Sequence, residues 1–219
     1  IKNYNNIEDL AKNWIPAQQI LNLDGKIKYF KTHNVNCTIN KNNFTDLNNT
    51  IGIIHVVRDP RNVVTSIKNH FSLNNIESAK EFILDEYMWL GYENKLESNK
   101  NNKIPTLISS WKTHYNSWKN KSKNYFLIKY EDLINNPYKS FFQISEYISS
   151  LTGMNFNKKK IENSITSNTF EELQKLEKNN LFKEQALNEG INKKVNFFHL
   201  GKNNKWQNLL DKKTIDEIE

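Results

Sequence analysis

The stretch that decides the fold spans residues 53–66 and reads Ile53-Ile54-His55-Val56-Val57-Arg58-Asp59-Pro60-Arg61-Asn62-Val63-Val64-Thr65-Ser66. Its first five residues are apolar apart from one histidine, a run too short for a helix and typical of a buried strand. Asp59 then suits the N-cap of a helix, and Pro60 suits its first turn. Apolar residues follow at helical spacing: Val63, Val64, Ile67 and Phe71. The stretch therefore predicts a strand that leads directly into a helix.

The same pattern recurs further along the chain. A second short apolar run, Tyr125–Ile128, predicts a buried strand, and Asn136-Pro137 predicts the start of a helix that Gly153 ends. A weaker run at residues 27–30 predicts another strand. Residues 76–96 carry a stripe of apolar side chains that predicts a long, core-facing crossover helix: Ile76, Ala79, Ile83, Tyr87 and Leu90. This alternation predicts an α/β fold with a largely parallel sheet and helices on both faces.

Length and composition fit one globular domain. The 219 residues suffice for one core, and they contain no internal repeat and no Gly/Ser-rich or Pro-rich linker, so we expect a single domain across residues 1–219. No stretch reaches the roughly 18 apolar residues that a membrane span requires. The one cysteine, Cys37, cannot form an internal disulfide or supply a cysteine-based zinc site. A chain with a single cysteine does not depend on internal disulfides, which favours a reducing, cytoplasmic location.

The chain is basic, with a net charge of +7. Such a charge is compatible with nucleic acid, a membrane surface or an anionic small molecule as the partner. Lysine and asparagine are spread along the whole chain, as a coding bias would produce. We therefore predict no nucleic-acid partner and keep nucleic-acid binding as the weaker alternative.

Polar residues follow each predicted strand, where ligands bind in sheets of this kind. They are Lys31-Thr32-His33-Asn34, Arg58-Asp59-Pro60-Arg61 and Tyr130-Glu131-Asp132. Asn62 and Ser66 stand four and eight residues after Arg58 and opposite the apolar stripe, so a guanidinium group and a hydroxyl can converge on one phosphate. The alternative is an ordinary capped helix whose arginine pairs with an acidic neighbour.

The stretch from Ile54 to Phe71 resembles the 3′-phosphate-binding signature of the cytosolic-type sulfotransferases. These enzymes use 3′-phosphoadenosine-5′-phosphosulfate (PAPS) as donor and release 3′,5′-phosphoadenosine (PAP). The resemblance implies that Arg58 and Ser66 bind the 3′-phosphate, because they match the family's arginine and serine in type and spacing.

Other landmarks of the same family follow in the expected order, and the resemblance covers roughly residues 14–208. Lys31-Thr32-His33 resembles a Lys-Thr-His segment, which implies that His33 is the catalytic base and that Lys31 lies near the sulfuryl group. Tyr130-Glu131-Asp132 resembles the segment whose tyrosine approaches the adenine. The spacing of Ser110-Trp111, His114 and Trp118 is also similar to the family's, and we expect it to serve packing.

Two C-terminal segments complete the resemblance. Asn168-Thr169-Phe170 is similar to a segment that closes over the adenine with the phenylalanine ring against the base. Gly201 and Trp206 keep the spacing of the family's closing Arg-Lys-Gly…Gly-Asp-Trp motif. This sequence departs from the motif, because His199 and Leu200 stand in the places of the arginine and lysine. Either the 3′-phosphate loses a contact or Lys202 replaces it.

The family's P-loop-like turn, which contains Ser-Gly-Thr-Thr and binds the 5′-phosphosulfate, has no counterpart among the six glycines. We expect the chain to begin after that loop and the first strand. The fold implied is then a P-loop-NTPase-like sheet without its N-terminal strand.

The resemblance implies a sulfotransferase that moves a sulfuryl group from PAPS to a hydroxyl or amine of a small-molecule acceptor, without a metal. Two alternatives remain open. A P-loop nucleotide or nucleoside kinase would need magnesium and a Gly-x-x-x-x-Gly-Lys-Ser/Thr loop. A noncatalytic module that binds PAP or another anion would not need His33, which would then be an ordinary surface or hydrogen-bonded histidine.

Overall fold

The computed structural model describes residues 6–91, 104–119, 122–182, 187–188 and 193–219. Its contacts divide the chain into two compact units. Unit 1 consists of residues 1–55 and 85–126, and unit 2 consists of residues 56–84 and 127–219. Each unit is described by itself below, and the expectation of a single domain stays a prediction.

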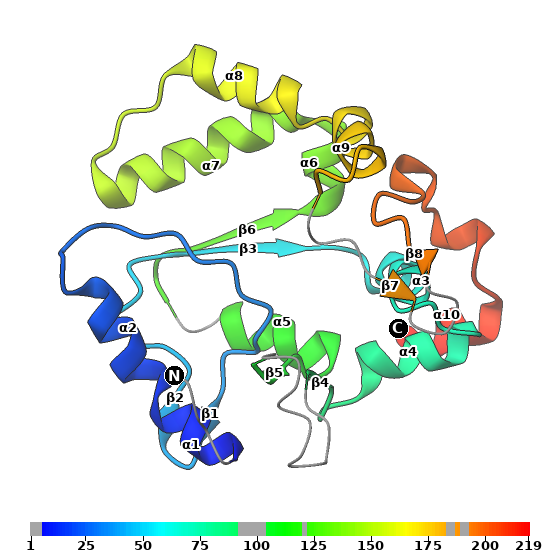
Figure 1. Ribbon diagram of the computed structural model, residues 1–219, viewed down its shortest axis with the longest axis horizontal. Coiled ribbons are helices and arrows are strands. Elements are labelled where there is room, and N and C mark those ends of the chain that lie inside the picture. Colours follow the sequence, from blue (N-terminus) through cyan, green and yellow to red (C-terminus); the bar gives the residue numbers. More distant parts are fainter. Residues whose placement is uncertain (1–5, 92–103, 120–121, 183–186, 189–192) are drawn as a thin grey trace. The chain divides into compact units, whose positions relative to one another are not determined.

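The predicted strands at residues 53–57 and 125–128 are confirmed. They form β3 (Ile53–Val57) and β6 (Tyr125–Lys129), which pair with each other and run in the same direction (Figure 1). His55 and Ile128 are their buried side chains, 9% and 5% exposed. Parallel strands connected through helices confirm the α/β class.

The predicted strand at residues 27–30 is wrong, because these residues lie outside every strand of the structure. Tyr29 and Phe30 are 62% and 66% exposed. A short apolar run becomes a strand only when a neighbouring strand supplies its backbone partners, and the sequence pattern alone does not show whether that partner exists.

Unit 1 consists of short helices and two hairpin-like strand pairs besides its share of β3 and β6. Its elements are α1 (Ile7–Lys12), α2 (Trp14–Asn22), β1 (Thr38–Ile39), β2 (Asn42–Asn43), β4 (Trp89–Leu90), β5 (Thr106–Leu107) and α5 (Trp111–Lys119). β1 pairs with β2 and β4 with β5, both antiparallel. Its core includes Leu10, Ala11, Val35 and Trp118.

Unit 2 is mainly helical. Its elements are α3 (Pro60–His70), α4 (Ile76–Leu84), α6 (Tyr130–Asn135), α7 (Pro137–Thr152), α8 (Lys158–Ser167), α9 (Phe170–Lys178), β7 (Leu187–Asn188), β8 (Lys193–Lys194), η2 (Gly201–Asn203), η3 (Trp206–Asn208) and α10 (Lys212–Ile218). Its buried apolar side chains are Val64, Ala79, Ile83, Ile128, Ile165 and Leu210. None of the helices in the described part of the chain is long and apolar enough to cross a membrane.

The predicted starts of α3 and α7 and the predicted end of α7 are confirmed. The Asp59 side chain accepts a hydrogen bond from the backbone N–H of Arg61 and thereby caps α3, whose first residue is Pro60. α7 begins at Pro137 and ends where Gly153 adopts a positive φ of 70°. The same φ would strain a residue with a Cβ, so glycine suits this C-terminus.

The long helix predicted for residues 76–96 is wrong beyond Leu84, where α4 ends. The Asp85 carboxylate accepts a hydrogen bond from the backbone N–H of Tyr87 at 2.8 Å, a local turn that competes with continuation of the helix. Tyr87 is therefore 81% exposed rather than in the core, and Leu90 belongs to β4. The rest of the predicted helix, residues 92–96, lies outside the described residues.

Candidate functional site

Arg58 and Ser66 meet in unit 2, where β3 leads into α3. Nη1 of Arg58 donates a hydrogen bond to Oγ of Ser66 at 3.0 Å. The guanidinium group also lies over the Tyr130 ring, 4.4 Å from its centroid. Within the described part of the chain, Nε of Arg58 is buried without a hydrogen-bond partner. Arg58 is therefore held in place on two sides, and its Nε–H is a buried donor that no described residue uses.

The closing segment of the chain supplies a third neighbour of Ser66. Nδ2 of Asn204 donates to Oγ of Ser66 at 3.0 Å, and Oγ of Ser66 is itself 3.2 Å from the carbonyl oxygen of Asn62. Asn204 is buried, with 7% of its surface exposed. A residue 138 positions away in sequence thus shares the hydroxyl that Arg58 contacts.

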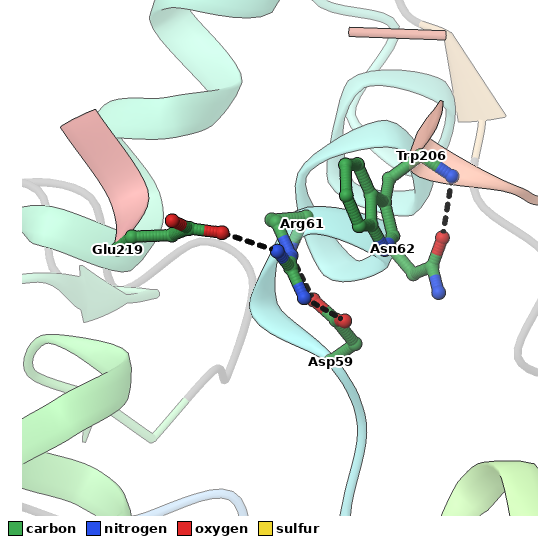
Figure 2. Close-up of polar contacts among 5 residues, drawn as sticks. All are labelled: Asp59, Arg61, Asn62, Trp206 and Glu219. Carbon is green, nitrogen blue, oxygen red and sulfur yellow. Dashed lines mark hydrogen bonds and ion pairs between the residues drawn. The ribbon is translucent and has the colours of Figure 1, made fainter. Parts of the chain in front are cut away.

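Arg61 ties the closing segment to the start of α3 (Figure 2). Its guanidinium group forms a two-point contact with the Asp59 carboxylate, at 2.9 and 2.7 Å, and donates to Glu219 at 2.5 Å. The same group lies 3.9 Å from the centroid of the Trp206 ring. Oδ1 of Asn62 accepts from the backbone N–H of Trp206 at 2.9 Å.

The electrostatics of this cluster favour the charged forms. Burial alone would raise the pKa of Asp59, but hydrogen bonds and positive charge from Arg61 lower it below the usual value. The hydrogen bond to Asp59 in turn raises the pKa of Arg61. The cluster therefore stays ionised near neutral pH and holds the segment that connects Arg58 with Ser66.

An aromatic ring lies against the backbone near the closing segment. Gly201 has a φ of +52°, and a Cβ added there would lie 2.7 Å from the Phe170 ring. Phe198 packs edge-on against the same ring at 5.9 Å. Only glycine allows this approach, so the packing of Phe170 depends on the one glycine that the closing motif keeps.

The other predicted residues of unit 2 are more exposed. Asn168 ends α8, where its side chain donates to the carbonyl oxygen of Ser164 at 2.8 Å. Lys202 and His199 have exposed side chains. Lys202 directly follows Gly201 in the chain, and its side chain is exposed to solvent.

Lys31 and His33 belong to unit 1, and both side chains are exposed. The backbone just after them is well anchored through Asn34. Oδ1 of Asn34 accepts from the backbone N–H of Leu107 at 3.0 Å, and its carbonyl oxygen accepts from Nε1 of Trp118 at 3.0 Å. The predicted packing role of Trp118 agrees with this buried contact.

Histidines in unit 1 lie close together. Burial lowers the pKa of His114, while a hydrogen bond with the backbone of His33 acts in the opposite direction. The His114 ring lies 5.7 Å from the ring of His55, whose Nδ1 is 2.8 Å from the Tyr125 hydroxyl. Burial and the neighbouring His114 lower the pKa of His55 to about 4. His55 is therefore a buried histidine that is neutral near pH 7.

The structure thus groups Arg58, Ser66 and Tyr130, and separately Phe170 with Gly201, all in unit 2. The sequence analysis placed Arg61 among the polar residues after a strand without giving it a role, and it missed Asn204. Arg61 had a usable signal, since it stands two residues after an N-cap carboxylate. Asn204 had none, because its contacts lie far away in sequence. No group of three or more metal-binding side chains occurs among the described residues.

A known protein family matches most of the chain. The family described as sulfotransferase domain matches residues 17–219. No curated protein matches at a significant level. A solved structure, mouse sulfotransferase SULT7A1 complexed with PAP, is 18% identical with a TM-score of 0.46, over 76% of this chain and 56% of that one. The chain spans little more than half the length of that protein, and a likeness at this level carries no functional argument.

Proposed function

The chain belongs to the sulfotransferase domain family, and from this premise we propose that it transfers a sulfuryl group from PAPS to a hydroxyl or amine of a small-molecule acceptor and releases PAP. The observation that carries the proposal is the contact of Arg58 with Ser66 at the end of β3. A fixed guanidinium group beside a hydroxyl is a suitable receptor for a phosphate dianion.

The residues present suit PAP in two respects. Arg58 retains a buried Nε–H that no described residue accepts. A buried donor without an acceptor destabilises the fold, so a phosphate oxygen that accepts this hydrogen bond would remove that cost. Phe170 is held against Gly201 and offers an aromatic face of the kind that stacks on a base. We propose that Arg58 and Ser66 bind the 3′-phosphate and that Tyr130 and Phe170 bind the adenine. Asn168, Gly201 and Lys202 are assigned to the same site by sequence resemblance.

We assign the proton transfer to His33. In sulfuryl transfer the acceptor O–H or N–H loses its proton as its oxygen or nitrogen bonds to sulfur, while the bond from sulfur to the departing phosphate breaks. A neutral imidazole accepts such a proton efficiently near neutral pH. Lys31 supplies a positive charge that stabilises the negative charge developing on the transferred group and the departing phosphate. These roles rest on the motif and need no metal ion.

The test is PAP binding measured by isothermal titration calorimetry in the absence of magnesium. We expect the natural-length protein to bind PAP and the Arg58→Ala variant to lose about 10- to 100-fold in affinity, because a charge-assisted contact with the phosphate is removed. Lys178→Ala is the charge-matched control, since Lys178 is an exposed cation at the end of α9. Its affinity should stay within about twofold of the wild type.

Two outcomes would contradict the proposal. Equal losses for Arg58→Ala and Lys178→Ala would mean that general charge, not a phosphate site, attracts PAP. Binding of ATP with magnesium, without any binding of PAP, would favour the kinase alternative. A cytoplasmic location and the absence of a nucleic-acid partner stay predictions from the sequence.

A further inference from the structure

Asn204 has a buried amide whose orientation the structure determines. Its Nδ2 donates to the carbonyl oxygen of Asn62 at 3.1 Å and to Oγ of Ser66 at 3.0 Å. Its Oδ1 accepts from the Thr65 hydroxyl at 2.5 Å. A carbonyl oxygen can only accept, so the amide nitrogen must be the atom that faces Asn62. Both protons of this nitrogen are therefore used within unit 2.

The Ser66 hydroxyl has two lone pairs and one proton. Nη1 of Arg58 and Nδ2 of Asn204 both donate to its oxygen at 3.0 Å, so both lone pairs are used. Its proton points to the carbonyl oxygen of Asn62, at the longer distance of 3.2 Å. That carbonyl also has the Asn204 amide as a donor. With both lone pairs fixed in this way, the proton keeps one direction, and a ligand oxygen near that direction can share it with the Asn62 carbonyl oxygen without leaving that oxygen unsatisfied.

We propose that Asn204 is a positioning residue that makes Ser66 a dedicated proton donor and thereby favours a phosphate over a hydroxyl at the 3′ position of the nucleotide. This inference rests on the proposed function. A phosphate dianion has only acceptor atoms and matches a hydroxyl whose lone pairs are occupied. A ligand hydroxyl would also offer a proton, for which Ser66 has no free lone pair.

This role also accounts for the altered closing motif. The arginine and lysine expected before Gly201 are replaced by His199 and Leu200, and the Lys202 side chain is exposed. Asn204 is buried and neutral, so it adds no charge to the site. It acts instead through the orientation of a hydroxyl that already contacts Arg58. Selectivity here depends on hydrogen-bond geometry more than on an added cation.

The experiment is a double-mutant cycle on PAP binding in the natural-length protein, measured by calorimetry. We expect Asn204→Ala to weaken PAP binding by about tenfold when Ser66 is present, the loss typical of one hydrogen bond to a charged group. In the Ser66→Ala background the same change should alter affinity by less than about twofold, because Asn204 then has no hydroxyl to position. Binding of adenosine 5′-phosphate, which lacks the 3′-phosphate, should change little in either background.

Asn203→Ala is the matched control, since Asn203 is the exposed neighbour in η2. If Asn204→Ala does not fold, as judged by circular dichroism, Thr65→Val takes its place, because it removes the hydroxyl that holds Oδ1 of Asn204. We expect the same dependence on Ser66. A loss of equal size in both backgrounds, or for both nucleotides, would overturn the inference and leave the proposed function standing. Failure of the wild type to bind PAP would overturn both.

Discussion

At the scale of the residue, His33 has an exposed side chain on an anchored backbone. Asn34, the next residue, forms hydrogen bonds with Leu107 and Trp118. These bonds fix the backbone beside His33, although the His33 side chain is exposed to solvent. A general base needs such a defined position together with access to its substrate. The residues proposed to bind PAP belong to unit 2, whereas His33 belongs to unit 1.

Replacement of His33 by alanine should therefore separate chemistry from donor binding. We expect sulfuryl transfer from PAPS to a panel of phenols and alcohols to fall by about 100-fold or more, because the proton acceptor is lost. Affinity for PAP by calorimetry should be unchanged. His199→Ala, which removes another exposed histidine, is the control and should keep its activity. Full turnover in His33→Ala would favour the noncatalytic alternative.

At the scale of the element, β3 and β6 carry a polar pair between them, a buried histidine and a half-buried tyrosine. His55 of β3 lies 2.8 Å from the Tyr125 hydroxyl of β6, and burial raises the pKa of Tyr125 to about 12. Tyr125 thus keeps its proton and can donate it to the neutral His55 ring. The pKa of His55 is about 4 in the folded chain, against an ordinary value of 6.5.

Acid should destabilise this strand pair in a defined pH window. The unfolded chain binds a proton at His55 as the pH falls through 6.5, and the folded chain does so only near pH 4, so stability is full above pH 6.5 and declines from there to pH 4. The loss should be on the order of 3 kcal/mol in the free energy of unfolding. Urea unfolding at several pH values should show a weaker dependence in His55→Phe. Tyr125→Phe removes a donor to the neutral ring but retains burial and His114, which lower the pKa of His55, so it should keep most of the dependence of the wild type.

Some elements of the fold were predictable from the sequence, and others were not. β3, α3, β6 and α7 were predictable because their apolar periodicity and caps are local. Residues 27–30 had the local pattern but do not form a strand. The meeting of Arg58 with Ser66 follows from helical spacing, but the contribution of Asn204 depends on contacts across about 140 residues. Local patterns cannot supply such contacts, because they depend on how the closing segment packs on α3.

At the scale of the whole molecule, the chain has a net charge of +7, and some of its cations are paired locally with carboxylates. Several lysines of the described residues lie beside carboxylates, including Lys12 with Asp9, Lys28 with Asp24, and Lys175 with Glu172. Lys80 is buried between Glu77 and Glu217. Nonspecific nucleic-acid binding instead requires many cations free to contact successive phosphates.

We therefore expect PAP and nucleic acid to be distinguished by salt. A DNA duplex of about 20 base pairs should bind weakly at low salt and lose that binding at about 0.15 M salt, because released counterions oppose association. PAP binding should decline less over the same range, since Nε of Arg58 is buried and screening is weaker for partly buried charges. The measurement is fluorescence anisotropy of labelled DNA, with and without excess PAP, beside calorimetry of PAP. Tight DNA binding at physiological salt that PAP displaces would show that the site serves a polyanion, and the basic character of the chain would then be functional in itself.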